Sequence, residues 1–188
     1  MKISQDWSPS ELGRELLRTA SSGPNGSAGT YGRSVAGAAL RFFALGRGRR
    51  RLLLTAAHHA NEWITAPLLL RFAGELAAGV WPGALDGTRV FFAPLVNPDG
   101  ARLVTGELAS GPLFENARRI AEKYPDIPFP DGWKANLRGV DLNLQYPAGW
   151  EEAKKIKFAA GWTGPAPRAL PPDPPHLAGA RHSPAHAG

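Results

Sequence analysis

Residues 51–70 read RLLLTAAHHANEWITAPLLL, and this stretch joins a strand-like run, a turn and a helix-like run. The run at 52–57 is apolar, and the residues after the turn suit a helix that has Pro67 in its first turn. His59 and Glu62 lie in the turn, at the end of the strand, where open α/β sheets place their sites. Because an imidazole and a carboxylate at this spacing can bind one Zn²⁺, the stretch predicts a zinc site.

The His-x-x-Glu pattern is short, and it also arises by chance in chains of this length. Solvated loop residues are therefore the alternative interpretation of His59 and Glu62. Further motifs in the chain are needed to distinguish a zinc site from solvated loop residues.

Composition narrows the classes of protein to consider. The chain has 188 residues, of which 43% are apolar, which is enough for one α/β domain with a core. It has no run of about 18 apolar residues, so no membrane span is expected, and its N-terminus lacks the apolar region of a signal peptide. The expected location is therefore the cytoplasm. Cysteine is absent, so any metal must be bound by His, Asp or Glu.

The net charge of +6 suggests nucleic acid as a possible binding partner. The densest basic cluster, Arg47 and Arg49 to Arg51, lies in the sequence GRGRRR and has no accompanying aromatic or basic face. A solvated turn is the favoured interpretation, so no nucleic-acid partner is predicted. Nucleic-acid binding through this turn stays as a third hypothesis.

Local patterns predict an α/β fold with a mixed, mostly parallel sheet flanked by helices. Ser8, Pro9 and Glu11 have the spacing of a capping box at the start of a helix. The predicted elements are a helix at about 9–20, a loop at 21–29, adjacent strands at 39–45 and 51–57 joined by the arginine turn, a helix at 65–80 and a strand at 88–96.

The second half of the chain is less regular. NPDG at 97–100 is a turn signal, and residues 107–132 form a polar, proline-interrupted excursion with a short helix. Residues 139–144 are predicted to form a short buried strand that carries Asp141 and Asn143 on one face. Residues 150–158 are weakly helical, and residues 164–188, with seven prolines, are predicted to be a disordered tail in which His176, His182 and His186 bind no metal.

Three ordered blocks resemble the zinc carboxypeptidases, the carboxypeptidase A-like metallopeptidases. They are HANEW at 59–63, NPDG at 97–100 and GVDLN at 139–143, and the resemblance covers roughly residues 25–168. The longer runs HANEWIT, WKANLRGVDLN and QYPAGWEEAKKIKF are similar to the γ-D-glutamyl-diaminopimelate endopeptidases of that family, which cut peptidoglycan stem peptides.

The resemblance implies a carboxypeptidase-like α/β fold, one Zn²⁺ and a peptide or muropeptide substrate. It makes His59 and Glu62 the first two metal ligands and leaves His58 as a neighbour. It assigns Asn143 to the substrate's terminal carboxylate, and Asn61 to the position of an Arg that orients the scissile carbonyl. Lys134 takes the place of a cation that stabilises the oxyanion.

Two departures from the family pattern bear on function. Leu144 stands where carboxypeptidases have the Arg that clamps a C-terminal carboxylate, which favours an endopeptidase. No third zinc ligand and no general-base Glu are assignable after GVDLN, so residues 1–163 are interpreted as the N-terminal part of the catalytic domain in a truncated or frame-shifted product. A non-catalytic peptide-binding or muropeptide-binding fragment, using Asn143 and Lys134, is the alternative.

Overall fold

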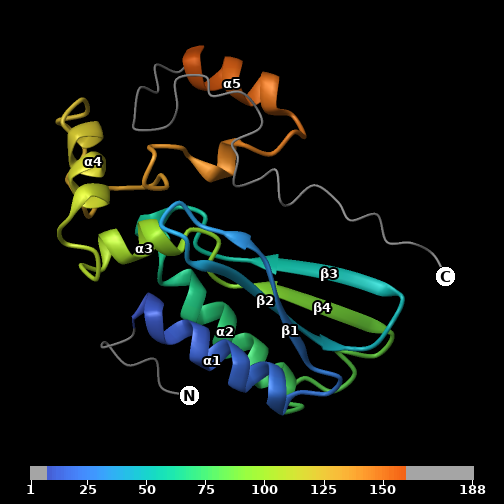
Figure 1. Ribbon diagram of the computed structural model, residues 1–188. Coiled ribbons are helices and arrows are strands. Elements are labelled where there is room, and N and C mark those ends of the chain that lie inside the picture. Colours follow the sequence, from blue (N-terminus) through green and yellow to red (C-terminus); the bar gives the residue numbers. More distant parts are fainter. Residues whose placement is uncertain (1–7, 160–188) are drawn as a thin grey trace.

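The computed structural model describes residues 8–159, which form one mixed sheet with helices packed on and beside it (Figure 1). In chain order the elements are α1 (Pro9–Ser22), β1 (Ser27–Arg33), β2 (Ala39–Gly46), β3 (Arg50–Thr55), the 3-10 helix η1 (Ala60–Glu62), α2 (Thr65–Ala77), β4 (Thr88–Ala93), α3 (Pro98–Val104), α4 (Pro112–Ala121), the 3-10 helix η2 (Leu142–Leu144) and α5 (Trp150–Ala159). The predicted tail at 164–188 and the domain boundary at 163 lie outside the described residues.

The strand order is β1-β2-β4-β3, so the sheet is mixed, as predicted, but mostly antiparallel rather than mostly parallel. β2 is antiparallel to both β1 and β4, and only β3 is parallel to β4. The prediction that β2 and β3 are adjacent strands was wrong, because β4 lies between them. The parallel pair is joined through α2, as a parallel connection requires a crossover.

The arginine turn passes over the start of β4 and does not close a hairpin. Arg50 N–H donates to the carbonyl of Gly87 at 3.2 Å. A Cβ on Gly48 would lie 2.0 Å from the backbone of Gly87, so only glycine allows this close crossing. The turn thus carries the chain across β4 to the far edge of the sheet.

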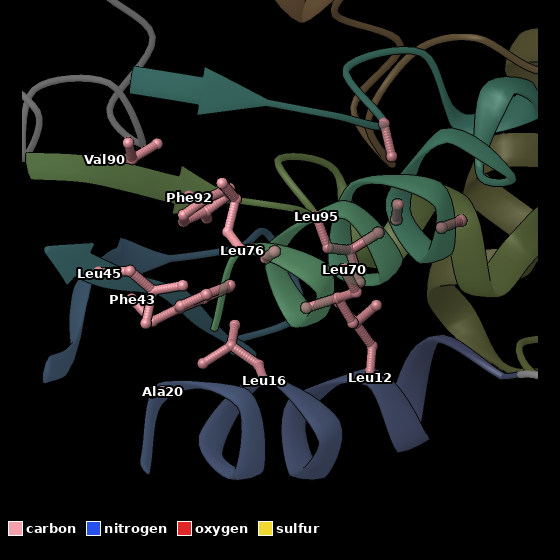
Figure 2. Packing of buried hydrophobic residues seen from close by; sticks show 14 residues of the cluster. Leu12, Leu16, Ala20, Phe43, Leu45, Leu70, Leu76, Val90, Phe92 and Leu95 are labelled. Carbon is pink, nitrogen blue, oxygen red and sulfur yellow. The ribbon is translucent and has the colours of Figure 1, made fainter. Parts of the chain in front are cut away.

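The main core lies between the sheet and the first two helices (Figure 2). The Ser8 hydroxyl accepts from Glu11 N–H and Pro9 opens the helix, so α1 begins where the capping box predicts. Leu12 and Leu16 of α1 are buried in the same cluster as Leu70 of α2 and the stacked Phe43–Phe92 pair, whose ring centroids lie 4.7 Å apart.

A second core lies beyond the ends of β3 and β4, where α3, α4 and residues 133–137 meet. Trp133, Leu103 and Leu137 are buried there, together with Ala117 of α4 and Ala60 of η1. Ala60 links this core to the turn that follows β3, so packing in the second core positions His59 and Glu62.

Asn97 joins the two cores, and NPDG is more than a turn. The Asn97 side-chain oxygen accepts from Gly100 N–H at 3.1 Å, and Pro98 opens α3, so Asn97 is its N-cap. The side-chain amide lies 3.0 Å from the carbonyl of Ala135 and 3.3 Å from that of His58. A Cβ on Gly100 would lie 2.6 Å from this amide, so the fourth residue of the motif must be glycine.

The prediction of a buried strand at 139–144 was wrong. Asp141 accepts from Asn143 N–H and caps the single turn η2, because an Asp side chain that bonds the backbone two residues on favours a turn over a strand. β1 also begins at Ser27, inside the predicted loop. The helices predicted at 9–20, 65–80 and 150–158 are present, with ends that differ by one to three residues.

Within residues 8–159 one face of the sheet is exposed, and both edge strands, β1 and β3, have no further strand beside them. Both α1 and α2 lie on the same face, so the expectation of flanking helices holds for one side only (Figure 1). On the other face Leu53 of the edge strand β3 is 66% exposed beside half-buried Phe91. No helix in this range is long and apolar enough to cross a membrane.

We expect Leu53→Lys to reduce aggregation. An exposed edge strand with apolar side chains is a template for intermolecular pairing, and a lysine there opposes it. Light scattering over a concentration series should fall, while the free energy of unfolding changes by no more than about 0.5 kcal/mol. Leu17→Lys on α1 adds the same charge at a 45% exposed leucine away from the edge. Equal suppression by both variants would assign the effect to net charge.

We expect Asn97→Ala to lower the free energy of unfolding by about 2–4 kcal/mol, because it removes a helix cap and leaves buried carbonyls without a donor. Denaturant unfolding measures this loss. Asn116→Ala is the matched control, since the half-buried Asn116 makes one hydrogen bond, to the Leu137 carbonyl at 3.1 Å, and should lose about 1 kcal/mol. Equal losses in the two variants would show that Asn97 does not join the cores.

Candidate metal and substrate site

The turn after β3 is fixed by backbone contacts on both sides. Asn97 N–H donates to the carbonyl of Ala57 at 3.0 Å, and Ala60 N–H donates to the carbonyl of Lys134, also at 3.0 Å. The Thr65 hydroxyl accepts from Ala57 N–H and donates to the carbonyl of Glu62, which ties the turn to the start of α2. His58, His59 and Glu62 therefore project from a well-anchored corner of the chain.

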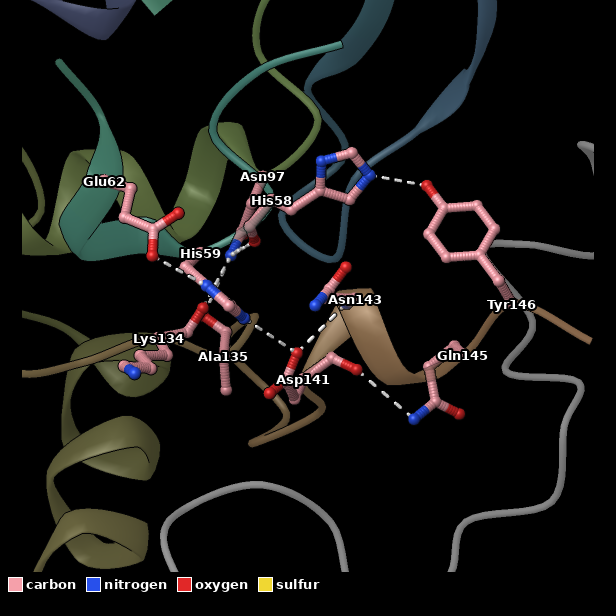
Figure 3. A network of polar contacts seen from close by, with 10 residues as sticks. All are labelled: His58, His59, Glu62, Asn97, Lys134, Ala135, Asp141, Asn143, Gln145 and Tyr146. Carbon is pink, nitrogen blue, oxygen red and sulfur yellow. Dashed lines mark hydrogen bonds and ion pairs between the residues drawn. The ribbon is translucent and has the colours of Figure 1, made fainter. Parts of the chain in front are cut away.

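His59 lies between two carboxylates (Figure 3). Its Nδ1 forms a hydrogen bond with Oε1 of Glu62 at 3.0 Å, and its Nε2 is 3.3 Å from Oδ1 of Asp141. The second contact has an ion-pair distance but not hydrogen-bond geometry, since Nε2 has no hydrogen-bond partner in the described residues. Glu62 and Asp141 thus face opposite nitrogens of one ring.

This geometry fits a zinc ligand pair. Two donor atoms that bind a tetrahedral Zn²⁺ at about 2.0–2.2 Å lie roughly 3.3 Å apart, close to the separation of His59 Nδ1 and Glu62 Oε1. Histidines that bind zinc usually present their other ring nitrogen to a carboxylate, which is where Asp141 lies. Glu62 is on the solvent side of the ring, with a side chain 53% exposed, so a cation can reach the pair.

Asp141 is itself firmly held. It is buried at the start of η2, where its Oδ1 accepts from Asn143 N–H at 3.0 Å. Its backbone carbonyl accepts from the buried side-chain amide of Gln145 at 3.3 Å. The carboxylate behind His59 is therefore in a position that the backbone of the turn determines.

His58 points the other way and contacts Tyr146. Its Nε2 lies 2.5 Å from the Tyr146 hydroxyl. Burial and the neighbouring His59 lower the pKa of His58. Burial raises the pKa of Tyr146, and burial together with Tyr146 raises the pKa of Tyr31 to about 12. Tyr31 is the extra residue of a bulge in β1.

The other predicted site residues lie on the same three segments. Asn61 is half-buried in η1, and Lys134 is half-buried on the strand-like segment that pairs with Ala60. Asn143 is exposed on η2, and in Figure 3 its side chain points from η2 toward the side where His58 lies. The fold thus gathers all five residues around one corner, and Leu144 follows Asn143 within η2.

Two features show that this corner is incomplete as a metal centre. Within residues 8–159 no three His, Cys, Asp or Glu side chains converge on one point. In the turn after β3 and the segment 141–146, three buried polar atoms have no hydrogen-bond partner among the described residues: His59 Nε2, Asn61 Oδ1 and Gln145 Oε1. Buried polar atoms without partners indicate a bound ion, water or polar ligand.

Sequence reasoning missed Asp141 as the partner of His59, and it set His58 aside. Asp141 had a signal, since it is an acidic residue within an apolar run and such residues are rarely buried without a partner. His58 and Tyr146 had none, because their contact joins segments that are distant in the chain.

Comparisons with known proteins identify the family of this chain. The profile of the zinc carboxypeptidase family (peptidase M14) matches residues 16–173. The chain is 36% identical over 130 residues to gamma-D-glutamyl-L-diamino acid endopeptidase 1 of Lysinibacillus sphaericus, covering 64% of this chain and 32% of that protein. It is 32% identical over 180 residues to uncharacterized protein YqgT of Bacillus subtilis (strain 168), covering 85% and 47%.

These relatives are longer, since the chain spans between a third and a half of their lengths. A metallo-carboxypeptidase from Burkholderia cenocepacia has the same fold over 81% of this chain and 38% of its own, with a TM-score of 0.53 and 17% identity. The fold is thus a partial carboxypeptidase-like α/β fold, and the chain belongs to the zinc carboxypeptidase family of metallopeptidases.

Proposed function

We propose that this chain carries the first part of a zinc peptidase centre, in which His59 Nδ1 and Glu62 Oε1 bind Zn²⁺ and Asp141 orients His59. The observation that carries the proposal is the 3.0 Å separation of the two donor atoms, with a buried carboxylate on the far side of the same ring. Bound zinc would supply an activated water and polarise the scissile carbonyl.

Three further residues have proposed roles toward a peptide. Lys134 places a cation near the developing oxyanion, as a point charge that is less directional than an arginine. Asn61 orients the scissile carbonyl by donating from its side-chain N–H, which agrees with its place in η1 beside Glu62. Exposed Asn143 binds a polar group of the substrate.

The proposed substrate is the γ-D-glutamyl-diaminopimelate bond of peptidoglycan stem peptides. The name of the Lysinibacillus sphaericus relative supports a γ-D-glutamyl-diamino acid bond. Leu144 supports an endopeptidase, because a leucine cannot make the bidentate contact with a C-terminal carboxylate that an arginine makes.

Hydrolysis by this chain is expected to be weak or absent. A catalytic zinc usually has three protein ligands, and a general base must take the proton of the attacking water. Residues 8–159 supply two ligands that converge, and no third His, Cys, Asp or Glu side chain completes a metal-binding group with them. The whole centre therefore needs groups from outside this range.

The alternative is a chain that binds muropeptides without cleaving them. It is favoured by the site's incomplete ligand set, which leaves exposed Asn143 and half-buried Lys134 as groups for a polar peptide. The two functions differ in whether binding needs metal.

We expect Zn²⁺ to bind with a dissociation constant on the order of micromolar or weaker, because two ligands hold zinc less tightly than three. In isothermal titration, Glu62→Gln should remove most of the affinity, and Asp141→Asn should weaken it by about 10–100-fold. Glu75→Gln on α2 is the matched control and should change nothing. Sub-micromolar binding together with peptidase turnover would contradict an incomplete centre, and equal affinities in all variants would place any zinc elsewhere.

A chelator separates the two functions. A synthetic stem peptide that contains the γ-D-glutamyl-diaminopimelate bond is titrated into the protein with zinc and then with EDTA. We expect the affinity to fall in EDTA if His59 and Glu62 hold a zinc that contacts the peptide. Unchanged affinity in EDTA would favour the metal-independent binder, and no binding under either condition would reject both.

A further inference from the structure

Two neighbouring histidines attach to the two ends of one short segment. His59 Nε2 lies 3.3 Å from Asp141 Oδ1, at the start of the segment 141–146, and His58 Nε2 lies 2.5 Å from the Tyr146 hydroxyl, at its end (Figure 3). Asn143 lies between these two attachment points. The segment is therefore held to the turn after β3 at both sides of Asn143.

Within the segment, the hydrogen bonds are short-range. Asn143 N–H donates to Asp141 Oδ1, Leu144 N–H donates to the Asp141 carbonyl, and Gln145 N–H donates to the Leu142 carbonyl. These bonds define the shape of η2, but they do not fix where η2 lies relative to His59 and Glu62. That placement depends on the packing of buried Leu142 and Gln145 and on the contacts of the side chains at the ends of the segment.

Tyr146 is suited to be such a contact. Its ring is 46% exposed, so it adds little to either core, yet its hydroxyl reaches back to a half-buried imidazole. The His58 and Tyr146 rings are tilted by 55° with centroids 5.7 Å apart, so they touch at their polar ends and are not stacked. Packing alone therefore does not explain the contact.

We propose that His58 and Tyr146 form a latch that positions Asn143 for substrate. The inference rests on the proposed function for its ligand, a γ-D-glutamyl stem peptide. The latch residues are positioning residues, since they act through Asn143 and do not touch the zinc ligands' donor atoms. Their contact fixes the carboxyl end of η2, while Asp141 fixes its amino end.

The test is a double-mutant cycle of Tyr146→Phe, His58→Leu and the double variant. Tyr146→Phe removes only the hydroxyl from a half-exposed ring, so the fold is retained. Each single variant should weaken stem-peptide binding by about three- to tenfold, and the double variant should lose no more than either single one. His58→Gln, whose side-chain amide can replace the ring nitrogen as a hydrogen-bonding group, should restore most of the affinity. Zinc affinity, measured separately, should change less than twofold.

Amide hydrogen exchange gives a readout that needs no peptide. The amides of Asn143, Leu144 and Gln145 should exchange faster in each single variant, and to the same extent in the double variant. A latch that is absent in solution would leave these rates unchanged. Losses of affinity that multiply in the double variant, or a parallel loss of zinc affinity, would overturn the latch in favour of general effects on stability.

The two proposals fail separately. If the unaltered protein binds no stem peptide, the proposed function is rejected and exchange alone decides the latch. If exchange accelerates while peptide affinity stays the same, the contact holds the segment but does not position Asn143, and the inference is overturned.

Discussion

The side chain of Asn97 is the interaction on which the placement of the site depends. Its oxygen caps α3, and its amide contacts the carbonyls of His58 and Ala135, so one buried group ties together the ends of β3 and β4 and the segment that carries Lys134. A buried amide that satisfies several backbone groups fixes their geometry, because any displacement leaves a polar group unpaired. The turn bearing His59 and Glu62 is consequently held through its own backbone groups, by the Asn97 side chain and by the Lys134 carbonyl.

Local chemistry explains which parts of the fold the sequence predicted. The cap at Ser8, the proline at the first helical position of α1 and the apolar runs of α2 and β4 act within a few residues, and these elements appear as expected. The strand order depended on the crossing at Gly48, a contact between distant backbones that no local pattern records. The prediction that β2 and β3 are adjacent was wrong because this crossing could not be predicted from local sequence.

The site also contains both local contacts and contacts between distant segments. His59 and Glu62 are three residues apart on one turn, so their convergence was visible in the sequence, and the structure brings their donor atoms together. Asp141 and Tyr146 meet the two histidines only because η2 folds back on the turn after β3. The short segment at 139–144 favoured a strand because its apolar and polar residues alternate. The capping hydrogen bond of Asp141 stabilises a turn instead, and an isolated strand has no comparable stabilisation.

The exposed edge of the sheet and the incomplete metal site are neighbours. β3 is an edge strand, it leaves Leu53 exposed, and its carboxyl end leads directly into the turn of His59 and Glu62. A strand added parallel to β3 would end beside that turn, because the carboxyl ends of neighbouring parallel strands lie at the same end of a sheet. A strand added there would pair with the backbone groups of β3 that are free within residues 8–159 and have its carboxyl end near His59 and Glu62.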